Sequence, residues 1–262
     1  MKRTLSLFSL LFLLLSLPLL PAMAEDSDTV TVTIANGALC YHGTVELTDL
    51  DADGTPSVHD ALLAAHIAAG RENDYLASPT EYGLSLMKLW GVENGGAYGY
   101  CVNTSPAMSL LDAVGAGDHV YAYVYTDLTA YSDAFAYFDR SHVTVTSGEK
   151  TTLSLSVLSY DEQFRPVTAP LVGATVLVDG KDSGALTDKD GRVTLSLSLT
   201  EGQRVTVSAS CADRIITPPV CVLEGIGNPA TGDDTTTYLI IAAAALGVVI
   251  LLLFLLPRNK RK

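Results

Sequence analysis

Residues 49–69 read DLDADGTPSVHDALLAAHIAA. Their second half, residues 61–69, is dominated by alanine and leucine, which are among the strongest helix formers. On the N-terminal side, polar and apolar residues alternate at 29–34, which is the pattern of a half-buried strand, and a second short strand is expected at 43–47. A helix set among strands predicts an α+β module, which we place at residues 25–140.

The first half of the opening stretch, residues 49–60, spaces oxygen-bearing side chains at positions one, three, five, nine and twelve of a 12-residue loop. Glycine stands at position six, where it allows a sharp turn. This spacing resembles the calcium loops of EF-hands and, because position twelve is aspartate, those of dockerins. The resemblance implies a Ca²⁺ site formed by Asp49, Asp51, Asp53, Thr55, Ser57 and Asp60. The alternative is a solvated acidic turn in which Asp60 only caps the following helix.

Several aromatic motifs follow the helix: WG at 90–91, YGYCVN at 98–103 and YAYVY at 121–125. In this order, after two strands and a helix, they resemble the C-terminal domain of transcobalamin-like proteins, a small module that also occurs in bacterial surface proteins. In transcobalamin and intrinsic factor this module closes over a corrinoid. The resemblance implies a site for a small planar ligand, a corrinoid or haem, with four contact residues: Trp90, Tyr98, Tyr100 and Asn103. The alternative is that these aromatic side chains belong to the core and the strand surface.

Residues 141–227 differ in texture and contain short alternating runs separated by Gly, Pro and Asp turns. This pattern predicts an all-β sandwich. Residues 172–178 and 186–193 resemble the Ig-like repeats of bacterial surface stalks, which implies a spacer. Within the second motif, residues 188–191 are expected to form a hairpin turn. The six expected strands lie at 142–146, 151–158, 174–178, 192–199, 204–209 and 220–223.

Both ends of the chain carry segments typical of export. Residues 1–24 have a basic start, an apolar centre and an Ala-Met-Ala end, which together predict a cleaved signal peptide. At the other end, the 19 residues 238–256 are apolar and are followed by a basic tail. A helix of this length spans roughly 28 Å, close to the thickness of the bilayer's hydrocarbon core. The sequence therefore predicts a C-terminal transmembrane helix with its tail in the cytoplasm.

The pentapeptide before this helix is Asn228, Pro229, Ala230, Thr231 and Gly232, and it belongs to a C-terminal segment covering 228–262. It resembles the sorting signal of Gram-positive surface proteins in its Asn-Pro-x-Thr form. The resemblance implies that a sortase cuts after Thr231 and joins the chain to an amine of peptidoglycan or of a pilin. The helix would then hold the protein in the membrane only before sorting. A plain membrane anchor is the alternative, but it leaves the pentapeptide without a role.

The chain is acidic, with 29 Asp and Glu residues against 16 Lys and Arg and a net charge of −13. Its terminal segments contain six of the basic residues, so the part between them is more acidic still. Such a surface repels nucleic acid and favours cations. The sequence contains no Gly-x-Ser-x-Gly, His-Glu-x-x-His or phosphate-loop motif, so no enzymatic activity is predicted.

The four cysteines, Cys40, Cys101, Cys211 and Cys221, all lie in the part expected to be exported, where disulfides persist. Four cysteines allow three pairings. Pairing within each proposed domain favours Cys40 with Cys101 and Cys211 with Cys221. There is no Cys-x-x-Cys motif to indicate a zinc or redox site.

Overall fold

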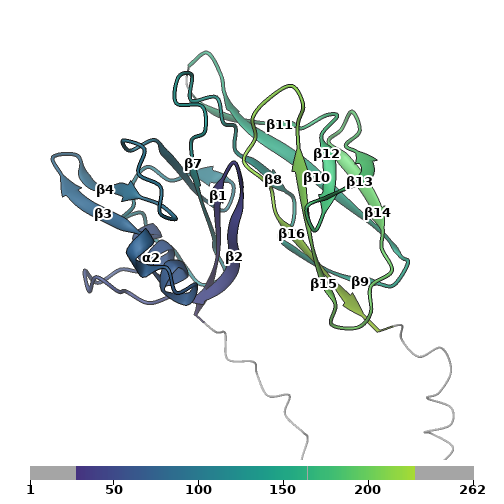
Figure 1. The fold of residues 1–262 in the computed structure, drawn as a ribbon, viewed down its shortest axis with the longest axis horizontal. Coiled ribbons are helices and arrows are strands. Elements are labelled where there is room, and N and C mark those ends of the chain that lie inside the picture. The colour runs from purple at the N-terminus through teal and green to yellow at the C-terminus, as the bar shows by residue number, and fades with distance from the viewer. Residues whose placement is uncertain (1–27, 164, 228–262) are drawn as a thin grey trace, which may run out of the picture. The chain divides into compact units, whose positions relative to one another are not determined.

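The computed structural model describes residues 28–163 and 165–227. The predicted signal peptide, sorting signal and transmembrane helix lie outside these residues. In the parts of the chain that are described, no helix combines the length and hydropathy needed to cross a bilayer. The described residues form two units: residues 28–34 together with Tyr41–Ala122 make the first, and Ala35–Cys40 together with residues 123–163 and 165–227 make the second (Figure 1).

The first unit contains most of a five-stranded sheet with the order β2-β1-β7-β5-β6, in which the strand ends at 35–36, 38–40 and 123–124 are grouped with the second unit. β1 and β2 follow one another through Gly37, whose φ of 64° suits a tight turn. In β1, Val30, Val32 and Ile34 are fully buried, as expected for one face of an alternating strand. The strands are β1 (Thr29–Asn36), β2 (Ala38–Glu46), β5 (Tyr98–Val102), β6 (Ser105–Pro106) and β7 (His119–Val124).

One α-helix, α2 (Val58–Ala68), contributes Val58, Leu62 and Ala65 to the core of this unit. A short 3₁₀ helix, η1 (Glu72–Asp74), connects it to a separate hairpin of β3 (Leu76–Thr80) and β4 (Gly83–Lys88). This hairpin is drawn apart from the larger sheet in Figure 1. The combination of one helix with strands agrees with the predicted α+β character.

The second unit is a β-sandwich of two sheets, which confirms the mostly β architecture expected from its alternating sequence. One sheet has the order β11-β10-β14, with β8 also paired to β10, and the other has the order β13-β12-β15-β16-β9. Leu153 and Leu155 of the first sheet and Val176, Val207 and Leu223 of the second are buried in one core. The strands are β8 (Ala136–Phe138), β9 (His142–Thr146), β10 (Lys150–Tyr160), β11 (Pro166–Pro170), β12 (Thr175–Val178), β13 (Lys181–Leu186), β14 (Arg192–Ser196), β15 (Arg204–Ser210) and β16 (Cys221–Ile226).

The sequence placed the boundary between the domains after residue 140, whereas in the structure the main segment of the second unit already begins at Tyr123. Residues 123–140 belong to the second unit because β8 pairs with β10 and buries Ala136 and Phe138 in the sandwich core. The turn at 188–191 also differs from expectation. It connects β13 to β14, which lie in different sheets, so it is a crossover between sheets and not a hairpin turn.

Neither predicted disulfide is formed in the structure. β2, which carries Cys40, and β5, which carries Cys101, are three strand positions apart. This corresponds to roughly 14 Å, whereas a disulfide needs Cα atoms within about 7 Å. In the second unit, Cys221 faces Val207 across the β15–β16 pair, and Cys211 lies four residues further along the chain. At the rise of an extended strand this separation is about 13 Å, which also exceeds disulfide reach.

Candidate binding groove and acidic loop

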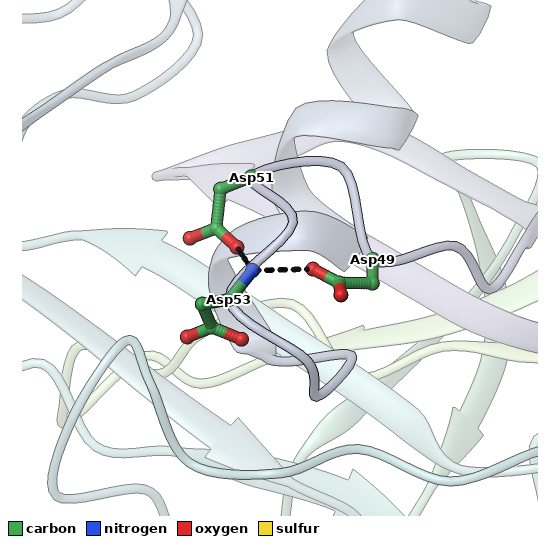
Figure 2. A group of neighbouring side chains, drawn as sticks. All are labelled: Asp49, Asp51 and Asp53. Carbon is green, nitrogen blue, oxygen red and sulfur yellow. Dashed lines mark hydrogen bonds between the residues drawn. The ribbon is translucent and has the colours of Figure 1, made fainter.

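The acidic loop brings three of its six predicted ligands together. One carboxylate oxygen from each of Asp49, Asp51 and Asp53 lies within 4.8 Å of the others (Figure 2). The Asp53 amide donates to Oδ1 of Asp49 and to Oδ1 of Asp51, each at 3.2 Å, and the Gly54 amide donates to Asp49 Oδ2 at 2.9 Å. Three converging carboxylates repel one another, and a hard cation with oxygen ligands would relieve this repulsion.

Asp60, the last predicted ligand, is turned toward the protein chain. Its side chain is only 1% exposed. Oδ1 accepts hydrogen bonds from the Leu50 and Asp51 amides at 2.8 and 3.3 Å. Oδ2 accepts from the Ser57 amide and hydroxyl at 2.9 and 2.6 Å, which completes a capping box at the start of α2. Ser57 is thus the N-cap of α2 and Asp60 is the third helical residue that completes its capping box, which corresponds to the capping role considered from sequence. The Thr55 amide donates to Asp53 at 3.0 Å.

Trp90, a predicted ligand contact, belongs to an internal aromatic cluster. Its ring lies 5.7 Å from that of Tyr41 and 5.0 Å from that of His66, and the Arg71 guanidinium stands 4.7 Å above it. Its amide donates to Nε2 of fully buried His66 at 3.1 Å, while Nδ1 of that ring lies 2.7 Å from the Leu62 carbonyl. The His66 imidazole is therefore the neutral tautomer with its proton on Nδ1, and burial lowers the pKa of His66.

Asn103, another predicted contact, closes a turn. Its backbone has a φ of 57°, a left-handed conformation that asparagine tolerates. Its Nδ2 donates to Asp118 Oδ1 at 2.9 Å, and its Oδ1 accepts from the His119 amide at 3.0 Å. All the hydrogen-bonding atoms of this amide are directed toward the turn that precedes β7.

Tyr98 and Tyr100, the remaining two predicted contacts, share an open groove of about 610 Å³. One wall consists of β5 and the Gly95-Gly96 loop before it. The other consists of the hairpin tip and β4, where Tyr82 is 90% exposed and Met87 is 41% exposed. Sequence reasoning missed this second wall. The single signal for it was the turn-like sequence before the alternating residues of β4.

Hydrogen bonds and charge define the character of the groove. The Tyr98 hydroxyl lies 2.8 Å from the Met87 carbonyl and 2.7 Å from the Val92 carbonyl, so it holds β5 against β4. Burial raises the pKa of both Tyr98 and Tyr100, and both phenols therefore remain neutral hydrogen-bond donors. Among the described residues that line the groove, Glu81 is the one that carries a charge. The groove thus combines aromatic rings, neutral donors and a single negative charge.

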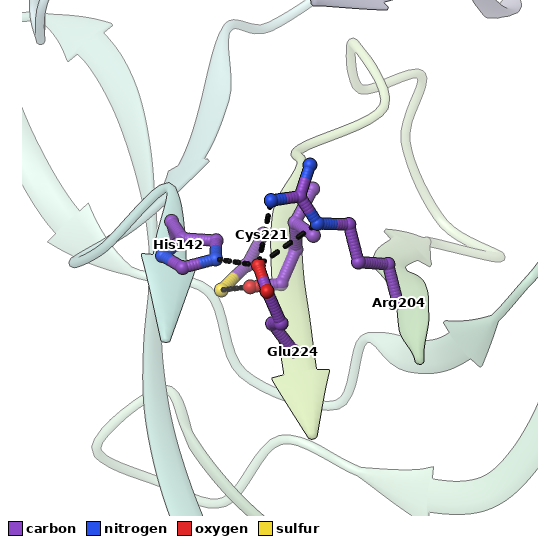
Figure 3. Close-up of polar contacts among 5 residues, drawn as sticks. His142, Arg204, Cys221 and Glu224 are labelled. Carbon is purple, nitrogen blue, oxygen red and sulfur yellow. Dashed lines mark hydrogen bonds and ion pairs between the residues drawn. The ribbon is translucent and has the colours of Figure 1, made fainter. Parts of the chain in front are cut away.

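A second polar cluster lies on the sandwich. The Glu224 carboxylate of β16 is 3.1 Å from His142 Nε2 of β9 and 2.7 Å from Arg204 Nη2 of β15 (Figure 3). Hydrogen bonds from His142 and then from Arg204 lower the pKa of Glu224. Because His142 and Arg204 are largely exposed, we regard the cluster as a brace across three strands.

No family model and no curated protein matches the chain. Among solved structures, it is similar to the four N-terminal Ig domains of Dscam1 isoform 9.44, solved with zinc, at 14% identity and a TM-score of 0.23. This similarity covers 58% of the present chain and 32% of the other. The chain is also similar to the Ig1-2 module of the Drosophila receptor protein tyrosine phosphatase DLAR, at 15% identity and a TM-score of 0.24, covering 61% and 77% of the two chains. These TM-scores are too low to carry an argument about fold or function.

Proposed function

We propose that this protein is a non-enzymatic binding protein of the bacterial cell surface. After export, a sortase would cut at Thr231 and join the chain to peptidoglycan or to a pilin. The first unit would recognise the partner, and the second would act as an Ig-like spacer between that unit and the wall. The observation that carries the proposal is the groove lined by Tyr82, Tyr98 and Tyr100.

The composition of the groove supports recognition of a large partner, a protein or a glycan. Tyrosine offers a wide, rigid contact surface at a low cost in conformational entropy, and Gly, Ser and Thr adapt their hydrogen bonds to the partner. The groove contains three tyrosines together with Gly95, Gly96, Ser85 and Thr80. It is open to solvent along the hairpin, as an adhesive surface requires.

A small planar ligand, a corrinoid or haem, is the second candidate. It is favoured by Tyr98 and Tyr100, which are two residues apart on β5 and therefore project from the same face of the strand. Trp90 and Asn103 would not contact a ligand in this groove, because both are bonded elsewhere in the first unit. In the described part of the chain, the residues that line the groove include no histidine to act as an axial ligand.

The acidic loop adds a proposed structural role for Ca²⁺. The ion would be held by Asp49, Asp51 and Asp53 and would brace the loop that leads into α2. Because Asp60 already fixes this loop to the helix, calcium would add to an existing brace.

The test compares the two ligand classes on the purified full chain. Absorbance titrations with cobinamide, cobalamin and haemin report planar-ligand binding, and arrays of extracellular-matrix proteins and glycans report adhesion. We expect saturable binding on the arrays that is lost in Tyr82→Ala. It should be retained in Tyr131→Ala, which removes an exposed tyrosine of the second unit, although Tyr131 is 56% exposed and Tyr82 is 90% exposed. A one-to-one spectral shift without array binding would favour the planar ligand, and neither signal would refute a binding role.

A further inference from the structure

The hairpin next to the groove has an open edge. In the described chain β4 pairs with β3 and with no other strand. Thr80 pairs with Gly83 across a two-residue loop, and Pro79 pairs with Leu84. In an antiparallel pair of strands, hydrogen-bonded and non-hydrogen-bonded residue pairs alternate. Proline has no N–H to donate, so Pro79 and Leu84 form a non-hydrogen-bonded pair, in which the main-chain N–H and C=O groups point away from the partner strand. The N–H and C=O of Leu84 therefore face the open edge, and alternation directs those of Leu86 the same way.

The groove runs along this open edge. Ser85 and Leu86 both line it although they are consecutive residues in the regularly paired part of β4, and Met87 lines it at the β-bulge that follows. Side chains of consecutive strand residues point to opposite faces, so a surface that touches both Ser85 and Leu86 follows the edge of the strand and not one of its faces. Unpaired main-chain donors and acceptors are thus part of the groove.

The opposite wall leaves room for a second backbone. Gly95 and Gly96 have φ angles of 76° and 93°, and no atom lies within 4 Å of the position that a Cβ would take at either residue. Beside them stand the rings of Tyr98 and Tyr100. At one end the Tyr98 hydroxyl already bonds the Met87 carbonyl, which leaves the edge groups of Leu84 and Leu86 for a ligand.

We propose that the groove binds an extended segment of a partner protein, which adds to β4 as a further strand. Such pairing takes its affinity from main-chain hydrogen bonds and its specificity from alternate side chains. Apolar side chains of the segment would face Tyr98 and Tyr100. A basic side chain would face Glu81, the one charged residue among the described residues that line the groove, on a protein of net charge −13. This inference deepens the proposed binding role and rests on it.

A peptide explains the groove better than a glycan does. A sugar ring would stack on the tyrosines but would not need the regular donors and acceptors of a strand edge. An edge left unpaired beside an aromatic wall is a template for another chain. A peptide bound to the edge of β4 would therefore form main-chain hydrogen bonds at every second residue, whereas a glycan would not show this alternation.

The first experiment uses peptides selected from a phage-displayed random library on the purified full chain. The tightest binder is synthesised with a fluorescent label and N-methylated at one residue at a time. We expect methylation to weaken binding by about tenfold or more at every second residue and to change it little at the residues between. A sensitivity pattern without this alternation would overturn the proposal.

The second experiment removes one donor from the protein. Leu84→Pro deletes the edge N–H while keeping the pairing with Pro79, and Leu84→Val keeps the N–H with a similar side chain. Peptide affinity should fall about tenfold in the proline variant and remain within about twofold in the valine variant. If Leu84→Pro proves unfolded by circular dichroism, the methylation pattern on the unaltered chain decides alone.

The outcomes separate this inference from the proposed function. Glycan binding that depends on Tyr82, together with failure of the library to yield any binder, would refute the strand pairing and leave the surface-binding role intact. Absence of protein, peptide, glycan and planar-ligand binding would refute both.

Discussion

The Ser57 hydroxyl donates a hydrogen bond of 2.6 Å to Asp60 Oδ2, and the Asp60 amide donates back to Ser57 Oγ at 3.4 Å. This reciprocal pair fixes the point at which the acidic loop becomes helix α2. Because Asp60 also accepts from the Leu50 and Asp51 amides, one buried carboxylate organises both the loop and the first helical turn.

Replacement of Asp60 should therefore destabilise the first unit strongly. Asp60→Ala removes the capping box and leaves the buried Ser57 amide and the Leu50 and Asp51 amides without their acceptor, which should cost about 2 to 4 kcal/mol in unfolding free energy. Urea denaturation in the presence of a chelator measures this cost. Asp53→Ala, in the same loop but exposed, serves as the control and should change stability by less than about 0.5 kcal/mol. Equal effects of the two substitutions would contradict the capping role.

Calcium should stabilise the chain through the other aspartates. At a free concentration about a hundred times its Kd, a bound ion adds about 2.7 kcal/mol to the unfolding free energy. We expect this gain to vanish in Asp51→Asn, with little change in stability in chelator. Thermal unfolding of the full chain with calcium, with magnesium and with chelator is the measurement. A melting temperature indifferent to calcium would rule out the site.

The sequence was most informative where strands are half-buried. All six runs expected in the second unit coincide with strands, because alternation directly reports one buried and one exposed face. Three described strands of the second unit were missed. β11 is exposed at all five residues and β13 is almost fully exposed, so neither alternates, and β8 has only three residues. The short β8 also explains the misplaced boundary between the units.

For the candidate site, the sequence indicated residue types better than side-chain directions. It singled out Tyr98 and Tyr100, which do line one groove, but also Trp90, which faces His66 and Arg71. The hairpin wall was not predicted because β3 has the sequence LASPT, and serine and proline are not typical of a strand interior. The loop spacing correctly grouped three aspartates, whereas the direction of Asp60 depends on backbone amides that the spacing does not reveal.

Acid should weaken the first unit through His119. Its Nε2 lies 2.7 Å from the Thr33 hydroxyl, and Nδ1 of His42 contacts the same oxygen at 2.8 Å. Burial, and then the charge of His42, lowers the pKa of His119 from 6.5 to about 4. Between pH 6.5 and about 4, the unfolded chain binds a proton at residue 119 that the folded chain does not bind. The unfolding free energy therefore falls as the pH drops through this window. Below about pH 4 both states are protonated at His119, and this residue causes no further loss.

The size of this loss is at most about 3 to 4 kcal/mol. His119→Gln removes this titrating group and should reduce the dependence of the unfolding free energy on pH in this window, while His42 and His66, whose pKa values burial also lowers, keep part of the slope. Urea denaturation at several pH values between 4 and 7 measures both slopes. If the variant kept the full slope of the unaltered protein, another group would have to be responsible.

Two thiols should be protected in the folded protein. Cys101 and Cys221 are 2% and 0% exposed, and burial raises the pKa of each thiol to about 12. Because the thiolate is the reactive form, both should resist iodoacetamide until the chain is unfolded. Mass spectrometry of alkylated peptides, without reductant, identifies the modified residues. A bond mapped between Cys211 and Cys221 would contradict the register of β15 and β16.

Gly225 in β16 should tolerate no side chain. A Cβ at this position would lie 2.1 Å from the Thr200 carbonyl oxygen, which belongs to the turn that packs on the strand. The contact is fixed from both sides, because the Gly225 amide donates to Gln203 and its carbonyl accepts from Gly202, each at 2.8 Å. Gly225→Ala must displace this turn or the strand.

We expect Gly225→Ala to cost about 2 to 3 kcal/mol in the unfolding free energy of the sandwich, as overpacking of a tight site does. Gly202→Ala is the matched control in the same turn. There a Cβ meets no atom within 4 Å, and only the φ of 74° opposes the substitution, at a cost of about 1 kcal/mol. Urea unfolding compares the two. If Gly202→Ala lowered the unfolding free energy as much as Gly225→Ala, the cost of a left-handed backbone, and not the close contact between residue 225 and Thr200, would explain the sensitivity of this turn.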